Sequence, residues 1–270
     1  TVACPECGPR AQLLDATGEP VDIDHPIAEA GILLEEGNII AVKGNGGFHI
    51  ASSTTRDEPI TRLRQTKGRR EKPFAVMARD VETVRSFAEV SPLEAELLTS
   101  YIKPILLLAK SRHYWLSPLI SPGLHNVGVM FPYTGLHLML FDRVKEPAFV
   151  MTSANAPGEP IIARNDDALK AMGSFVDYFL VHNREIAHRC DDSVVRLVAG
   201  EEAIIRRSRG YAPSPITVGF TSRRTVLSLG GELNVTSCIL MRDKAFISQH
   251  IGDLERLETL RFLENAAKHL

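Results

Sequence analysis

The sequence predicts an α/β protein, or an α+β protein with a mixed sheet, because strand and helix patterns interleave along most of its length. Residues 38–42 and 105–108 are short apolar runs of the kind that form buried strands. Residues 27–36 begin after Pro26 and end before Gly37, which are typical start and stop residues of a helix. With 44% hydrophobic and 24% charged residues over 270 positions, the composition is that of a globular protein.

Local signals predict the elements that follow. Asp57 is expected to cap a helix over residues 57–66, and Ser91 with Glu94 is expected to form the capping box of a helix that runs to about residue 101. Further helices are predicted at 136–141 and 165–172, and further strands at 74–78, 127–131, 148–151 and 178–181.

The last part of the sequence is predicted to form a new unit. Residues 194–198 and 203–207 flank a short turn and are typical of a β-hairpin. Pro213 and Pro215 then make a stiff linker. Beyond the linker, three short strands and a helix are expected, at 226–229, 238–241, 245–248 and 253–270.

Bulk properties argue against some classes of function. The formal net charge is −2, which does not indicate wholesale binding of nucleic acid or of a membrane surface, although it allows a local basic pocket. No apolar run reaches membrane-spanning length and no signal peptide opens the sequence. We therefore expect a cytoplasmic protein with no membrane partner and no nucleic-acid partner.

Cys4 and Cys7 have the spacing of a zinc knuckle, and a structural zinc site takes four ligands. No second cysteine pair or nearby histidine pair completes the site, and the first histidine is His25. We expect the missing ligands to lie upstream in a longer protein. A chance cysteine pair in a flexible terminus is the alternative.

A basic run lies between a predicted helix and a predicted strand. It places four cations, Lys67, Arg69, Arg70 and Lys72, and one carboxylate within six positions. Fixed positive charge at such a junction suits a polyphosphate. The alternative interpretation is a solvated basic turn.

Polar groups also follow other predicted strands. Ser153 and Asn155 come after residues 148–151, and three arginines close the hairpin, Arg206, Arg207 and Arg209. Because ligands collect at strand ends in α/β sheets, we expect these groups and the basic run to share a site for a nucleoside triphosphate. Ser153 could instead be a simple cap, which needs no ligand.

Three more features of the sequence each allow a functional and a structural interpretation. The glycines at positions 44, 46 and 47 would let the backbone approach a ligand, or would simply make a turn between strands. His49 and His182 could act on a substrate, although structural roles are commoner. Asp191 and Asp192 could bind a metal, although a turn before the hairpin is the commoner role.

Several motifs resemble the YrdC domain, a family that makes carbamoyl-type adenylates from ATP. They are Lys67-Gly68-Arg69 with Lys72-Pro73-Phe74, Thr152-Ser153-Ala154-Asn155 with Gly158-Glu159-Pro160, and the run from Arg206 to Arg209-Gly210. Further stretches resemble the HypF family of carbamoyltransferases, which mature nickel–iron hydrogenases; these stretches are 4–10, 42–49, 191–196 and 248–255. The resemblance covers nearly the whole sequence.

The resemblance implies a division into three segments. Residues 1–20 would be the tail of a zinc-finger-like region, and residues 21–215 a YrdC-like ATP-binding adenylation domain with a twisted mixed sheet and flanking helices. Residues 216–270 would be the truncated N-terminal part, opening strands and helix, of a Kae-type carbamoyl-transfer domain of the actin-like ATPase class. One departure stands out. Residues 51–55 occupy the place where the family pattern has an aspartate-containing stretch, which puts a substrate contact there in question.

The resemblance also implies a reaction. ATP and carbamate derived from carbamoyl phosphate would give carbamoyl-adenylate, and the carbamoyl group would pass to the C-terminal cysteine of a HypE-type acceptor, on the way to the cyanide ligands of the hydrogenase. Mg²⁺ would accompany ATP, and Zn²⁺ would bind the longer protein.

Residue roles follow from the same resemblance. The catalytic residues would be Lys67, Arg69, Ser153 and Asn155. The nucleotide would be bound by these four together with Lys72, Thr152, Arg207 and Arg209. Lys43 and His49 would contact the carbamoyl end, and Cys4 and Cys7 would be part of the zinc site.

Two other functions stay open at this point. One is a threonylcarbamoyl-adenylate synthase of tRNA modification, against which the stretches at 4–10 and 248–255 argue. The other is a non-catalytic RNA-binding module that uses the basic pocket, whose affinity would fall steeply with salt.

Overall fold

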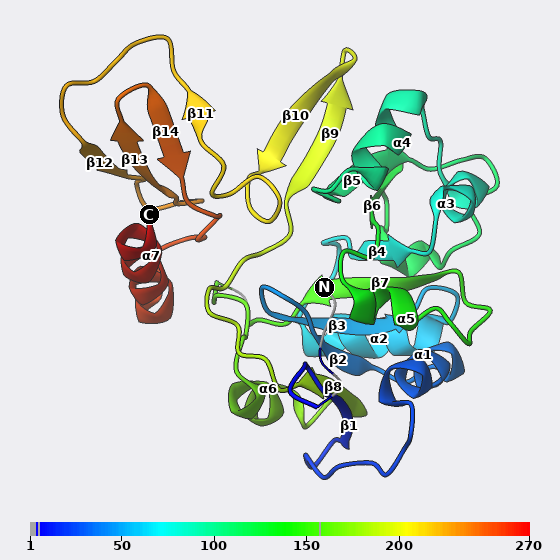
Figure 1. The fold of residues 1–270 in the computed structure, drawn as a ribbon. Coiled ribbons are helices and arrows are strands. Elements are labelled where there is room, and N and C mark those ends of the chain that lie inside the picture. Colours follow the sequence, from blue (N-terminus) through cyan, green and yellow to red (C-terminus); the bar gives the residue numbers. More distant parts are fainter. Residues whose placement is uncertain (1–3, 5, 157) are drawn as a thin grey trace.

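The computed structural model describes residues 4, 6–156 and 158–270 and arranges them around two β-sheets (Figure 1). The strands of the larger sheet, in spatial order, are β1 (Ala11–Asp15), β8 (Tyr178–His182), β2 (Ile40–Lys43), β3 (Phe48–Ser53), β7 (Ala148–Ser153), β4 (Ala75–Ala78), β6 (Asn126–Met130), β5 (Ile105–Ala109), β9 (Val194–Val198) and β10 (Glu201–Arg206). The pairs β2/β8, β4/β6 and β5/β9 are parallel and the other neighbours are antiparallel. The mixed sheet expected from the sequence is confirmed.

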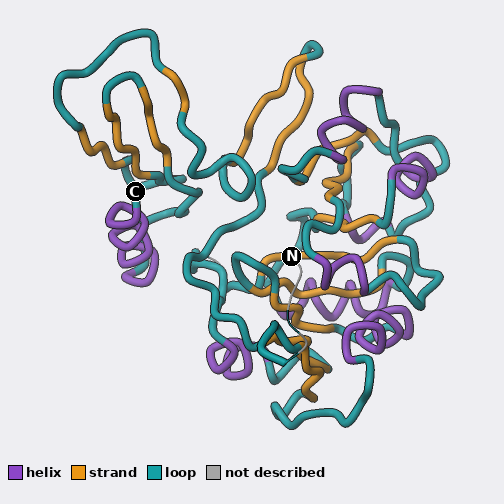
Figure 2. Tube along the Cα trace, in the orientation of Figure 1, coloured by secondary structure: helices purple, strands orange, loops and turns teal. Residues whose placement is uncertain are grey.

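Helices cover both faces of this sheet (Figure 2). They are α1 (Pro26–Glu36), α2 (Asp57–Thr66), α3 (Val81–Phe87), α4 (Pro92–Thr99), α5 (Gly135–Met139) and α6 (Asn165–Met172), with a short 3₁₀ turn at Pro118–Ile120. Ile50 and Ala51 are neighbours in β3 but belong to two different apolar clusters, one shared with Leu63 of α2 and the other with Leu34 of α1. Because successive strand residues point to opposite faces, these clusters form the two layers of the core.

Capping chemistry explains several helix starts. The Ser91 hydroxyl accepts from the Glu94 N–H at 3.3 Å, and the Glu94 carboxylate accepts from the Ser91 N–H at 2.8 Å, as the capping box predicts. The N-cap expected at Asp57 is wrong, because Asp57 is already the first helical residue. Its carboxylate instead accepts a hydrogen bond from the Ser117 hydroxyl.

The sheet begins before the boundary expected at residue 20. Residues 11–15 form β1, which pairs antiparallel with β8 over its whole length at the edge of the sheet. This strand lies in the segment that the sequence assigned to a zinc-finger-like tail. The segment therefore supplies an edge strand to the larger sheet.

Packing explains the glycines between β2 and β3. A Cβ atom on Gly46 would lie 2.2 Å from the backbone oxygen of Cys190, and one on Gly47 would lie 2.5 Å from the Ile161 side chain. These neighbours belong to the protein itself. The structure therefore favours the interpretation of these glycines as a tight turn.

The residues after the linker form a smaller unit beside the protruding hairpin of β9 and β10 (Figure 1). Its four antiparallel strands, in spatial order, are β11 (Ile216–Thr217), β14 (Lys244–Ile247), β13 (Ser237–Met241) and β12 (Val226–Leu229), and α7 spans Leu257–His269. Phe262 and Leu263 of α7 pack with Val235 and Ile251 in a small separate core. Throughout the described part of the chain, no helix has the length and apolar character needed to cross a bilayer.

Candidate functional site

The basic loop after α2 reaches the end of β7. The Lys67 Nζ donates to the Ser153 carbonyl at 2.9 Å and to the Asn155 carbonyl at 3.0 Å. Lys67 is buried. One ammonium group thus joins two segments that are distant in sequence, since Lys67 and Ser153 are 86 positions apart.

Arg69 and the residues after β7 complete this arrangement. The Arg69 guanidinium donates to the Thr152 hydroxyl at 3.1 Å and lies over the Phe74 ring. The Ser153 hydroxyl donates to the Asn155 side-chain oxygen at 2.9 Å, and the Asn155 amide donates to the Glu159 carbonyl at 2.8 Å. The basic loop and the segment Thr152–Asn155 therefore lie together at one end of β7.

Arg64 is a supporting residue that the sequence did not indicate. Its guanidinium is buried in α2 and donates to the carbonyls of Leu119, Arg69 and Arg70. These bonds fix the backbone of the basic loop. An arginine on the inner side of an amphipathic helix gives no sequence signal for this role, because its partners are carbonyls of distant loops.

Burial and mutual repulsion destabilise the charged forms of the cations in this loop. Burial lowers the pKa of Lys67 to about 7, and the charges of Arg69 and Lys72 contribute. Burial also lowers the pKa values of Arg69 and Lys72, and Arg206 lowers both further by its charge. Such a cluster is relieved by a bound anion, which restores favourable partners to all of these groups.

The three arginines after the hairpin have different surroundings. Arg207 donates to the carbonyls of Ile247, Tyr211 and Ser214, so it braces the linker. The side chain of Arg206 has no hydrogen bond or ion pair within residues 4, 6–156 and 158–270, and its charge acts on the basic loop. Of the two, Arg206 is the one free to meet a ligand beside Lys67.

Arg209 is committed to protein partners. Its guanidinium donates to Asp192 at 2.8 Å and to the carbonyls of Ile102 and Lys103, and it lies 3.6 Å from the centre of the Tyr133 ring. It therefore clamps the base of the hairpin to the loop before β5.

His49 belongs to this second cluster. Its Nε2 lies 2.8 Å from an Asp192 carboxylate oxygen. Burial alone would raise the pKa of Asp192, but His49 and Arg209 outweigh it and hold that pKa well below its usual range. Both carboxylate oxygens of Asp192 are thus engaged by His49 and Arg209. The structure therefore does not favour Asp192 as a ligand of the metal considered from the sequence.

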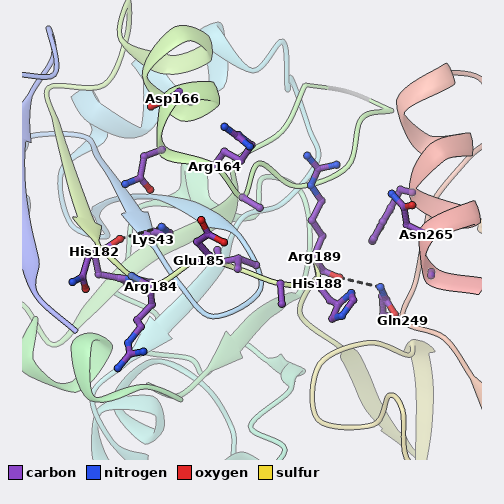
Figure 3. Close-up of a pocket in the computed structure, with 17 residues that line it drawn as sticks. Lys43, Arg164, Asp166, His182, Arg184, Glu185, His188, Arg189, Gln249 and Asn265 are labelled. Carbon is purple, nitrogen blue, oxygen red and sulfur yellow. Dashed lines mark hydrogen bonds between the residues drawn. The ribbon is translucent and has the colours of Figure 1, made fainter. Parts of the chain in front are cut away.

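Lys43 lies at a cavity of about 570 Å³ between the loop after β8 and α7 (Figure 3). Its Nζ donates to the His182 carbonyl at 3.1 Å. A second, shallower hollow of about 420 Å³ is lined by Arg69 and Arg70 beside the basic loop. Lys43 therefore lines a different cavity from Arg69. His49 lines neither, and it pairs with Ser153 in the sheet.

Cys4 and Cys7 are both exposed, and the Gly8 N–H donates to the Cys4 carbonyl. No group of three or more metal-ligating side chains occurs among the residues described here. Two thiolates make half of a structural zinc site. These residues alone do not fit a resident zinc ion.

Comparison with known families gives a clear assignment. Residues 32–208 match the family model of Sua5, YciO and YrdC, described as telomere recombination. The chain belongs to the Sua5/YciO/YrdC family. Residues 221–270 match a second model, the HypF Kae1-like domain.

Within this family the chain is homologous to HypF carbamoyltransferases. It is 46% identical over 249 residues to the probable carbamoyltransferase HypF of Methanocaldococcus jannaschii, which covers 92% of this chain and 32% of the relative. It superposes on the crystal structure of T. kodakarensis HypF with a TM-score of 0.94 and 44% identity over 99% of this chain and 35% of that one. The chain therefore spans about a third of the length of these relatives.

Two further relatives show that the chain is more similar to HypF than to a threonylcarbamoyl-AMP synthase. Full-length HypF in a phosphate- and nucleotide-bound form matches with a TM-score of 0.93 and 41% identity, covering 99% of this chain and 35% of that one. The threonylcarbamoyl-AMP synthase of Bacillus subtilis is more distant, with 25% identity over 150 residues, 54% of this chain and 43% of that protein. The HypF resemblance expected from the motifs is confirmed.

The departure from the family pattern at residues 51–55 has an internal explanation. The side chains of Ser53, Thr54 and Thr55 donate to the buried Glu146 carboxylate at 3.0, 2.9 and 3.1 Å. Ser53 pairs with Phe149, whereas Ser153 pairs with His49 at the other end of β3. This segment therefore holds a carboxylate of the chain itself, at the opposite end of the strand from Ser153.

Proposed function

We propose that this chain forms carbamoyl-adenylate from ATP and carbamate, as part of a carbamoyltransferase. The observation that carries the proposal is the junction of Lys67 and Arg69 with the end of β7, through Ser153, Asn155 and Thr152. HypF relatives at 41–46% identity over most of the chain support the carbamoyl substrate. Residues 21–215 are the proposed adenylation domain, and residues 216–270 the first part of the transfer domain.

The phosphates of ATP would lie against the basic loop. Lys67 and Arg69 supply positive charge there, and Lys72 and Arg206 face the same region. The hydroxyls of Thr152 and Ser153 and the amide of Asn155 complete the shell around the phosphates. The donor set of two hydroxyls and a carboxamide also suits Mg²⁺ bound to the triphosphate, which would add positive charge.

The reaction is a nucleotidyl transfer. A carbamate oxygen forms a bond to the α-phosphorus, the bond from that phosphorus to the bridging oxygen breaks, and its electron pair leaves with pyrophosphate. Negative charge builds on the leaving group and on the non-bridging oxygens. Preorganised cations stabilise such charge without a covalent enzyme intermediate. Of the two residues expected at the carbamoyl end, His49 remains the proposed contact, because it pairs with Ser153 across β3 and β7. Lys43 instead lines the separate cavity of Figure 3.

The later steps involve partners outside this chain. Carbamoyl phosphate is the proposed source of carbamate, and the C-terminal cysteine of a HypE-type protein is the proposed acceptor of the carbamoyl group. Cys4 and Cys7 would contribute to a zinc site only together with ligands from elsewhere in a longer protein.

ATP–pyrophosphate exchange tests the proposal and separates it from the alternative. Three reactions are compared, with ammonium carbamate, with carbamoyl phosphate, and with bicarbonate plus threonine. Exchange that requires carbamate supports carbamoyl-adenylation. Exchange that requires threonine would assign the chain to threonylcarbamoyl-adenylate synthesis, and salt-sensitive RNA binding without any exchange would indicate the non-catalytic module.

A further inference from the structure

The ammonium group of Lys43 is buried beside the cavity in Figure 3 without a close counter-ion. The residue is 4% exposed, and its hydrogen bond to the His182 carbonyl uses one of three N–H donors. Within the described ranges no carboxylate oxygen lies within 4.0 Å of its nitrogen, and Glu185 acts on it only at longer range. A buried charge without a partner is costly unless a ligand compensates it.

The walls of the cavity add more positive charge than negative. The charged lining residues are Lys43, Arg164, Arg184 and Arg189 against Asp166 and Glu185. Arg184 and Arg189 form no ion pair in the part of the chain that the structure covers, and Arg164 has only a 3.9 Å contact with Asp167. Guanidinium groups with free donors are suited to binding oxyanions, phosphate above all.

The size and the other wall of the cavity indicate more than an inorganic ion. A volume of about 570 Å³ falls in the range of small-molecule sites. Ile186, Phe262 and Ala266 give it an apolar side. Phe262 and Ala266 belong to α7, so the cavity exists only where the smaller unit meets the larger one.

We propose that this cavity is a binding site for a small organic phosphate, distinct from the cluster around Lys67. Lys43, Arg164 and Arg189 hold the phosphate group, and the organic part lies against Phe262. Because both units line the site, an occupant bridges them. The proposal does not depend on the adenylation reaction.

Isothermal titration of the whole chain with phosphonoacetamide, a stable phosphonate, tests the site, with inorganic phosphate and AMP in parallel. Lys43→Met should weaken phosphonoacetamide binding by about tenfold or more, the factor that corresponds to one charge-assisted contact. Asn265→Trp, at an exposed lining position on α7, should obstruct the cavity and weaken binding without changing a charge. Inorganic phosphate should bind more weakly, since it leaves the apolar wall uncovered.

Lys67→Met is the matched control, because it removes the other buried ammonium group and should leave phosphonoacetamide binding unchanged. Thermal unfolding without ligand checks the fold, and Lys43→Met should be at least as stable as the parent because an unpaired buried charge is removed. If Lys67→Met abolishes phosphonoacetamide binding while Lys43→Met and Asn265→Trp do not, or if no probe binds the parent chain, the proposal is wrong. Its failure leaves the exchange assay of the adenylation proposal unaffected.

Discussion

At the scale of single residues, the properties of Lys67 depend on its burial and on its neighbours. It is buried, and its nitrogen joins two carbonyls beside two other cations. Its pKa is lowered from 10.5 to about 7 by burial first and by Arg69 and Lys72 next. Near neutral pH its charge therefore responds to the arrival of an anion.

This pKa gives the nucleotide affinity a defined pH dependence. Above about pH 7 the free protein holds Lys67 mostly neutral, whereas bound phosphate favours the ammonium form, so binding must take up a proton. The affinity for ATP should fall as the pH rises above about 7, by up to about tenfold per pH unit, and should be insensitive to this group below it. Calorimetry in buffers of different ionisation enthalpy measures the proton uptake. Uptake of no proton at about pH 8, with an affinity equal to that at pH 6, would contradict the assignment.

Arg206 and Arg207 are adjacent and should behave differently. Arg206→Gln should raise the KM for ATP by about tenfold or more, through the loss of a charge-assisted phosphate contact, with little change in the unfolding temperature. Arg207→Gln should instead lower the unfolding temperature, because its bonds to Ile247, Tyr211 and Ser214 are lost. Steady-state kinetics and thermal unfolding of both variants provide the check. The reverse pattern would show that Arg207 meets the phosphate.

At the scale of elements, the start of α7 supports the loop that holds Asn155. The Thr259 hydroxyl donates to the Gly158 carbonyl at 3.0 Å, and Arg256 lies 3.5 Å from the Glu159 carboxylate. The Glu159 carbonyl in turn accepts the Asn155 amide. Contacts therefore run continuously from the smaller unit to the proposed phosphate shell.

Thr259→Val removes one of these contacts while it keeps the shape of the side chain. The KM for ATP should rise by about threefold to tenfold, as expected for one hydrogen bond, because Asn155 is held less firmly. Thr99→Val is the matched control, since its hydroxyl donates to the Ala95 carbonyl within α4, away from the site. An unchanged KM in Thr259→Val would mean that α7 does not position Asn155.

The elements also separate what the sequence can predict from what it cannot. Helix α6 has the predicted bounds, 165–172, because its signals are local. Strand β3 is not predicted, since Ser52 and Ser53 are polar residues that are nevertheless buried. The Ser52 hydroxyl is satisfied by the Ser53 carbonyl, and the Ser53 hydroxyl by Glu146, which the fold brings from more than ninety positions away.

At the scale of the whole molecule, the proposed site depends on topology as much as on motifs. The motifs predicted the grouping of Lys67, Arg69, Ser153 and Asn155, because the basic loop and the segment after β7 each follow the end of a regular element. They could not distinguish among the arginines of the hairpin. That choice depends on a shift in the pairing of β9 and β10 between Ile204 and Arg206, which only the assembled sheet reveals.

Hydrogen bonds to backbone carbonyls join the two units, one of them between residues that line the cavity of Figure 3. The His250 N–H donates to the Arg207 carbonyl, and the Gln249 amide donates to the Arg189 carbonyl. These partners lie in the loops that leave β10 and β8. The stretch at 248–255, one of the four that resemble the HypF family, is thus part of the junction between the units.

Carbamate-dependent ATP–pyrophosphate exchange in Arg69→Lys, compared with the parent chain, tests most directly whether the basic loop is the phosphate site. Lysine keeps the positive charge but cannot bind two oxygens in the fixed geometry of a guanidinium. It also loses the stacked position over Phe74. The exchange rate should fall by about tenfold or more while the unfolding temperature stays near that of the parent. Exchange at the parental rate in a folded Arg69→Lys protein would contradict the account.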